Sequence, residues 1–95
     1  MHSYELVAII SPEIDEEGIA RIIDEVDRCV TKRGGTASET RKWGKRKLAY
    51  PIKKFMEGNY ISTQFKLEPK LIKETAAEIG APEEVLRHLI VKAGD

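Results

Sequence analysis

Residues 41–54 form the stretch of this sequence whose side chains are best suited to bind another molecule. The stretch contains seven cations and no acid, although the whole chain of 95 residues has zero formal net charge. Trp43 and Tyr50 are interleaved with these cations, and cations beside aromatic rings suit phosphate contacts combined with stacking. Lysines on an edge strand also prevent sheets from aggregating, so edge protection stays open beside nucleic-acid binding. The seven cations are Arg41, Lys42, Lys45, Arg46, Lys47, Lys53 and Lys54.

Side chains typical of catalysis do not form any known catalytic pattern in this sequence. It contains no HExxH pair, no paired cysteines, no glycine-rich phosphate loop and no G-x-S-x-G turn. His2 and His88 have no evident nucleophile beside them, and Cys29 lies close to an apolar stripe, as small core residues do. The acids between residues 13 and 27 are typical of a solvated helix face rather than a metal site. We therefore expect no enzyme activity, no cofactor and no metal.

Length and composition indicate one domain spanning residues 1–95. With 41% apolar and 34% charged residues, the chain is typical of a well-solvated globular protein. No apolar run approaches the roughly 20 residues needed to cross a bilayer, and the N-terminus lacks the pattern of a secretion signal. The single Cys29 fits a reducing compartment. We expect a cytoplasmic protein that does not contact a membrane.

The hydrophobic pattern predicts four strands and two helices. Residues 4–10 are apolar on both faces, as a central strand is, and apolar residues then recur at helical spacing from 19 to 30. Pro51 places a strand over residues 36–54, kinked at Gly44, at a sheet edge, and residues 56–59 turn the chain into a strand over 60–67. A second helix begins at Pro69, and a last strand covers residues 85–93. This order predicts an α+β, ferredoxin-like βαββαβ sandwich, with a four-stranded antiparallel sheet and both helices on one face.

One face of the predicted sheet is left open and carries apolar side chains. If alternate residues of the first strand point toward the helices, Val7 and Ile9 point away from them, and we place Leu89 and Val91 on the same open face with Tyr60. A bare patch of this kind indicates a docking surface for another protein, although scattered surface residues are an alternative. We interpret Leu48, Tyr50 and Ile52 as core residues of the edge strand, and Trp43 at the bend suits either surface.

The central part of the basic stretch carries a resemblance to a known family. The motif Trp43-Gly44-x-Arg46-x-Leu48-Ala49-Tyr50-Pro51-Ile52, the opening Tyr4-Glu5-Leu6-Val7 and the closing Arg87-x-Leu89-Ile90-Val91-Lys92 resemble the bacterial small-subunit ribosomal protein S6 family. The resemblance covers essentially the whole chain. It implies the ferredoxin-like fold and a structural, non-catalytic role in the small ribosomal subunit.

The resemblance also implies two partners, small-subunit (16S-type) ribosomal RNA and ribosomal protein S18, the latter as a heterodimer. We expect the isolated chain to be a monomer. An alternative from another class is a ferredoxin-like regulatory module that binds a ligand and homo-oligomerises through the open face. The RNA candidates are His2, Tyr4, Arg46, Lys53, Lys54, Arg87 and Lys92. The protein-partner candidates are Val7, Ile9, Trp43, Tyr60, Leu89 and Val91.

Overall fold

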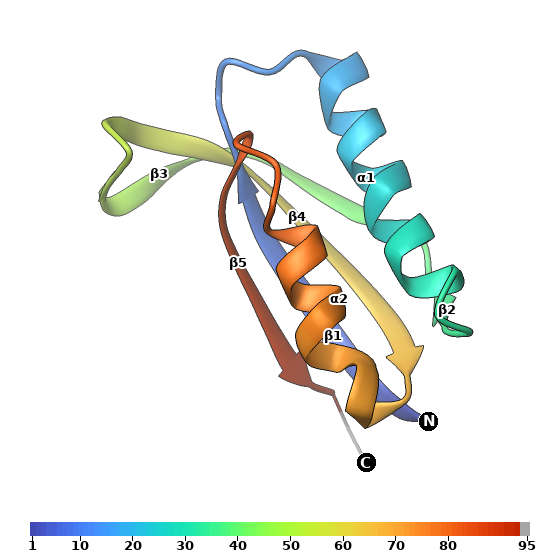
Figure 1. Cartoon of the computed structure of the whole chain (residues 1–95). Helices are drawn as coiled ribbons and strands as arrows, with labels where there is room; N and C mark the ends of the chain where they lie inside the picture. The colour runs from blue at the N-terminus through green and yellow to red at the C-terminus, as the bar shows by residue number, and fades with distance from the viewer. Residues whose placement is uncertain (94–95) are drawn as a thin grey trace.

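The computed structural model of this protein describes residues 1–93, which form one antiparallel sheet covered on one side by helices (Figure 1). In the sheet, β1 lies between β5 and β4, and β4 pairs on its other side with β2 and β3. This topology confirms the predicted ferredoxin-like fold. The elements are β1 (His2–Ile10), α1 (Glu16–Thr31), β2 (Thr36–Ala37), β3 (Arg41–Ile52), β4 (Phe55–Leu67), the 3-10 turn η1 (Pro69–Leu71), α2 (Ile72–Ile79) and β5 (Val85–Lys92).

The central strand β1 divides its residues between two environments. Its even-numbered residues from Tyr4 to Ile10 are buried beneath the helices, whereas Glu5, Val7 and Ile9 are only partly covered on the other face. The same alternation on β4 buries Phe65 in the core. Because side chains alternate along a strand, the register of β1 decides which of its residues are left on the open face. The predicted orientation of β1 is confirmed.

The helix α1 begins and ends where its sequence favours it. The Asp15 side chain accepts a hydrogen bond from the Gly18 backbone N–H at 2.9 Å and so caps the first turn. After the last turn, Gly34 adopts a φ of +84°, which other residues rarely reach, and the Gly35 N–H bonds the Val30 carbonyl at 3.0 Å. Cys29 lies in the core as predicted. Burial, with a smaller effect of the Glu78 carboxylate, raises the pKa of its thiol.

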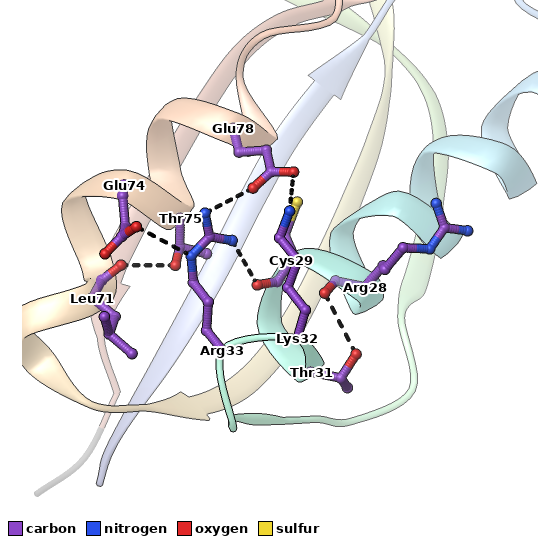
Figure 2. Close-up of polar contacts among 9 residues, drawn as sticks. All are labelled: Arg28, Cys29, Thr31, Lys32, Arg33, Leu71, Glu74, Thr75 and Glu78. Carbon is purple, nitrogen blue, oxygen red and sulfur yellow. Dashed lines mark hydrogen bonds and ion pairs between the residues drawn. The ribbon is translucent and has the colours of Figure 1, made fainter.

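An ion-pair cluster joins the end of α1 to α2 (Figure 2). Glu78 accepts contacts from Lys32 at 2.6 Å and from Arg33 at 2.8 Å. Arg33 also donates to the Cys29 carbonyl at 2.9 Å, which holds its guanidinium against both helices. The hydrogen bonds from Lys32 and then Arg33 lower the pKa of Glu78 to about 2. The helix layer therefore neutralises two of its own cations internally.

The edge of the sheet differs from the prediction in two respects. The expected strand over 36–54 is divided, because residues 38–40 belong to no strand and separate β2 from β3. The chain turns at Lys53 and Lys54, both with positive φ, so that Ile52 pairs with Phe55, and the expected turn over residues 56–59 lies inside β4 instead. Gly58, which suggested a turn, is buried in the strand. The bulge predicted at Gly44 is confirmed by a register shift there and a φ of +87°.

Candidate functional site

The open face of the sheet brings together the side chains expected to meet a protein partner. Val7 lies between Ser62 of β4 and Leu89 of β5, and Ile9 lies next along β1 between Tyr60 and Arg87. Leu89 and Val91 are 58% and 44% exposed. No helix among residues 1–93 covers this face (Figure 1). The structure therefore leaves a contiguous apolar surface in contact with solvent.

Trp43 belongs to this open face and is held there by a hydrogen bond. Its indole N–H donates to the Ser62 hydroxyl at 2.9 Å, and Ser62 is buried beneath it. The guanidinium groups of Arg41 and Arg46 lie 5.9 and 5.8 Å from the centre of the indole ring, within the range of cation–π interaction. Trp43 itself is still 47% exposed. The sequence left open whether Trp43 belongs to the RNA-binding or the protein-binding surface. The structure places it on the open sheet face with Val7.

The β3–β4 hairpin extends beyond the helices, and this changes the environment of the signature residues (Figure 1). Leu48 is buried as predicted and Ile52 is partly buried, but Tyr50 is 54% exposed, so its assignment to the core is wrong. The helices do not reach beneath the tip of the hairpin, and no core is available there. Tyr50 instead accepts a hydrogen bond from Arg87, whose guanidinium lies 5.9 Å from the Tyr50 ring centre. This contact therefore links the β3–β4 hairpin to β5.

The residues expected to contact RNA form two groups rather than one. Arg46, Lys53, Lys54 and Arg87 are exposed at the hairpin end of the sheet. Lys92 is opposite Tyr4 on β1, and five residues at about 3.3 Å each separate it from Arg87 by about 17 Å. His2 lies at this second end too, near the N-terminus (Figure 1).

Tyr4 does not present its side chain to solvent as an RNA-contacting residue would. It is only 8% exposed, and its ring stacks on Phe65 with the ring centres 5.5 Å apart. Even-numbered residues of β1 face the core, so the Tyr4 side chain points into the core as Leu6 does. The partly covered His2 ring lies 6.4 Å from the Tyr4 ring, so Tyr4 supports His2 from below.

Other titratable side chains form no second site among residues 1–93. No group of three His, Cys, Asp or Glu side chains there could hold a metal ion, and no described helix is long and apolar enough to span a membrane. Burial, followed by the charge of Asp24, raises the pKa of Asp27 within the acidic helix. The His88 ring packs against Gly80, where any added Cβ would collide with it at 2.2 Å. His88 therefore has a packing role at the end of α2.

Comparison with known proteins identifies the family. A family model described as Ribosomal protein S6 matches residues 3–92. The chain belongs to the ribosomal protein S6 family. The expectation of a non-enzymatic, structural ribosomal protein is thereby confirmed.

Individual members of the S6 family are similar over nearly their whole length. The small ribosomal subunit protein bS6 of Fusobacterium nucleatum is 38% identical, over 97% of this chain and 98% of that relative. The bS6 protein of Bifidobacterium longum is 39% identical, over 98% and 96%. Both are named as proteins of the small ribosomal subunit, which is cytoplasmic in bacteria.

Solved structures agree with the family and the fold. The crystal structure of 30S ribosomal protein S6 from Thermotoga maritima superimposes with a TM-score of 0.89, at 28% identity over 97% of this chain and 87% of that one. The C-terminal domain of the MgtC protein from Mycobacterium tuberculosis reaches a TM-score of 0.65 at 10% identity, over 98% and 88%, and shares the fold alone.

Several residues of this S6 site were not among the predicted RNA or protein-partner candidates. Glu5 and Ser62 lie on the open face, and Arg41 and Tyr50 contact other site residues. For Glu5 a signal existed, because it shares the odd-numbered face of β1 with Val7. For Tyr50 a signal also existed, because it is an aromatic residue among the cations of residues 41–54, but alternation along β3 favoured the core.

Proposed function

We propose that this chain is one domain over residues 1–95 and a structural constituent of the small ribosomal subunit, where it binds 16S-type ribosomal RNA together with ribosomal protein S18. The observation that carries the proposal is an uncovered apolar sheet face adjoining a basic hairpin. The apolar sheet face suits contact with a protein, and the basic hairpin suits contact with RNA phosphates. Membership of the S6 family supports this ribosomal interpretation over a regulatory ligand-binding module of the same topology.

The open face is the surface proposed for S18. Leu89 and Val91 are exposed beside the partly covered Val7 and Ile9, and Tyr60 and Trp43 add aromatic area of the kind enriched at protein interfaces. Burying these side chains against a partner removes apolar surface from water. Base stacking suits this surface poorly, because its centre on β1 and β5 is aliphatic.

The hairpin end is the surface proposed for RNA phosphates. Of the cations in residues 41–54, only Lys42 forms an ion pair within residues 1–93, with Glu16 at 3.4 Å. Arg46, Lys53 and Lys54 thus have their charges available, and Arg87 lies beside them. His2 and Lys92 supply a second contact at the other end of β1, with Tyr4 in a supporting position beneath His2.

A binding titration tests the two partners together. Labelled RNA of the central domain of the small subunit is titrated with the chain alone, with S18 alone and with both. We expect weak binding by the chain alone, tight binding by the mixture, and a steep fall in affinity with salt, because each phosphate contact releases counterions. Equal affinity of the chain for RNA with and without S18 would contradict the proposal that the two proteins bind RNA cooperatively. Sedimentation of the isolated chain tests the expected monomer, since a stable homo-oligomer favours the regulatory alternative.

A charge-reversed pair of variants tests the RNA surface. Arg46→Glu with Lys54→Glu weakens RNA binding and reduces the salt dependence by about one unit of slope for each phosphate that the variant no longer neutralises. The matched control is Lys70→Glu with Lys73→Glu, which makes the same charge change on exposed residues at the helix layer. Unchanged RNA binding by the first pair would show that the edge charges serve only to prevent aggregation.

A further inference from the structure

Glu5 is the one acid that the described strands β1, β4 and β5 present on the open face near Trp43. It is partly buried on β1, opposite Gln64 of β4 and Val91 of β5. No cation of residues 1–93 forms an ion pair with its carboxylate. Because the Glu5 carboxylate is partly covered and forms no ion pair with a described residue, this position gains from a cation that a partner brings.

A hollow of about 300 Å³ lies beside Glu5. Val7, Tyr60 and the indole of Trp43 form its apolar part, and Glu5, Arg46 and Ser62 complete the lining. The Trp43 ring cannot move freely, because Ser62 holds its N–H at 2.9 Å. The hollow is thus a preformed apolar slot with a carboxylate at its side, which matches a side chain with an apolar stem and a charged end.

We propose that this hollow receives one arginine or lysine side chain of the protein partner. This inference rests on the proposed docking of S18 to the open face. The methylene stem packs against Val7 and Tyr60, and the charged end pairs with Glu5. Because Arg46 lines the same hollow, loss of the Glu5 charge leaves two cations facing each other, so Glu5 contributes more than an ordinary ion pair at the rim of an interface.

RNA fits the hollow less well than a protein side chain does. The Glu5 carboxylate repels a phosphate. A stacked base would need an uncovered aromatic face, but two guanidinium groups already lie within 6 Å of the Trp43 ring centre, at 5.9 and 5.8 Å. The electrostatics of the hollow therefore select a cationic side chain, while the phosphate contacts remain at the hairpin.

The test measures the affinity of the intact chain for purified S18 by calorimetric titration. We expect Glu5→Gln, which keeps the size of the side chain and removes its charge, to bind S18 about tenfold or more weakly. Glu5→Asp retains the charge and recovers part of the affinity. The matched control is Glu17→Gln on the exposed side of α1, with expected binding within twofold of the unchanged protein. Circular dichroism and thermal melting verify that each variant is folded.

A double-mutant cycle identifies the incoming side chain. Each arginine and lysine of S18 is replaced in turn by methionine, which keeps an apolar stem. If the inference is correct, one of these S18 variants binds the unchanged chain and Glu5→Gln with the same affinity. If the unchanged chain binds S18 and Glu5→Gln binds equally well, the inference is overturned and the proposed function stands. If Glu5→Gln strengthens RNA binding and leaves S18 binding unchanged, RNA occupies the hollow and the inference is overturned. If the unchanged chain does not bind S18, the inference and the proposed function both fail.

Discussion

Gly58 is the position where the structure makes a sharp prediction about the open face. It is buried in β4 beside β1, and a Cβ added there would lie 2.4 Å from Cγ2 of Ile9 and 3.3 Å from the Ile10 carbonyl oxygen. Ile9 is β-branched and has little freedom about χ1, so it cannot swing away easily. Glycine at this position therefore allows Ile9 to lie flat against the neighbouring strand. Gly58→Ala is expected to destabilise the protein chiefly through its contact with Ile9.

The change in the free energy of unfolding for Gly58→Ala is the balance of two opposing effects, overpacking and the replacement of a flexible glycine. Overpacking of this kind costs about 1–3 kcal/mol, whereas replacing glycine by alanine within a strand gains about 0.5–1 kcal/mol. The net loss for Gly58→Ala is then about 0–2.5 kcal/mol. Ile9→Ala alone costs about 1 kcal/mol, since it removes three carbons that are only partly buried. In the Ile9→Ala background the collision with Cγ2 is absent and only the 3.3 Å contact with the Ile10 carbonyl oxygen remains, so Gly58→Ala costs less than it does beside isoleucine. The expected coupling energy is about 1–3 kcal/mol, the overpacking cost that Ile9→Ala relieves.

Urea unfolding followed by circular dichroism measures all four proteins of this cycle. Their m-values need to agree for the free energies of unfolding to be compared. Gly35→Ala is the matched control, because its added Cβ would meet the Lys66 carbonyl oxygen at 2.4 Å rather than Ile9, and Ile9→Ala cannot relieve that contact. The reasoning is refuted if Gly58→Ala has the same effect with isoleucine and with alanine at position 9.

Two further predictions concern the helix layer and the tryptophan. The folded-state pKa of Glu78 is lowered to about 2 from an ordinary 4.5, so its ion pairs stabilise the fold above pH 4.5 and this contribution is lost as the pH falls toward 2. Thermal melting from pH 6 to pH 2 is therefore expected to decline less for Glu78→Gln than for the unchanged protein or for Glu17→Gln; identical declines would contradict the assignment. Trp43→Phe leaves the buried Ser62 hydroxyl without its partner, at a cost of about 1–3 kcal/mol in the free energy of unfolding, and the double change with Ser62→Ala costs less than the sum of the two single changes. Strictly additive values in urea unfolding would show that this hydrogen bond contributes nothing.

The central strand shows how far sequence alone could predict the site. β1 is apolar at consecutive positions, and alternation along a strand leaves only two possible assignments of its faces. Choosing one of them assigned Val7 and Ile9 correctly to the open face. The same rule, followed consistently, contradicts the placement of Tyr4 on an RNA-facing surface, because Tyr4 has the parity of Leu6. Tyr4 was an RNA candidate through the family resemblance, whereas its position on β1 places its ring in the core.

The hairpin shows where sequence reasoning ended. The turn predicted over residues 56–59 lies inside β4, and two lysines with positive φ, Lys53 and Lys54, form the turn instead. Gly58 leaves room for Ile9 of the neighbouring strand. Tyr50 alternates correctly with Leu48 and yet is exposed. Its environment depends on where the helices stop beneath the sheet, and nothing within residues 41–54 encodes that distance.

Sequence by itself therefore determined the order of the elements, the edge position of the strand that contains Pro51, the uncovered apolar face and the family. The family follows from the resemblance of its motifs, whereas the other three depend on local properties: side-chain alternation, helical spacing, and the missing N–H of proline. Tertiary structure alone decided that Trp43 lies over Ser62, that Arg87 meets Tyr50, and that the predicted RNA contacts fall into two groups. These depend on strand register and on the reach of the helices, which arise from contacts between residues far apart in the chain.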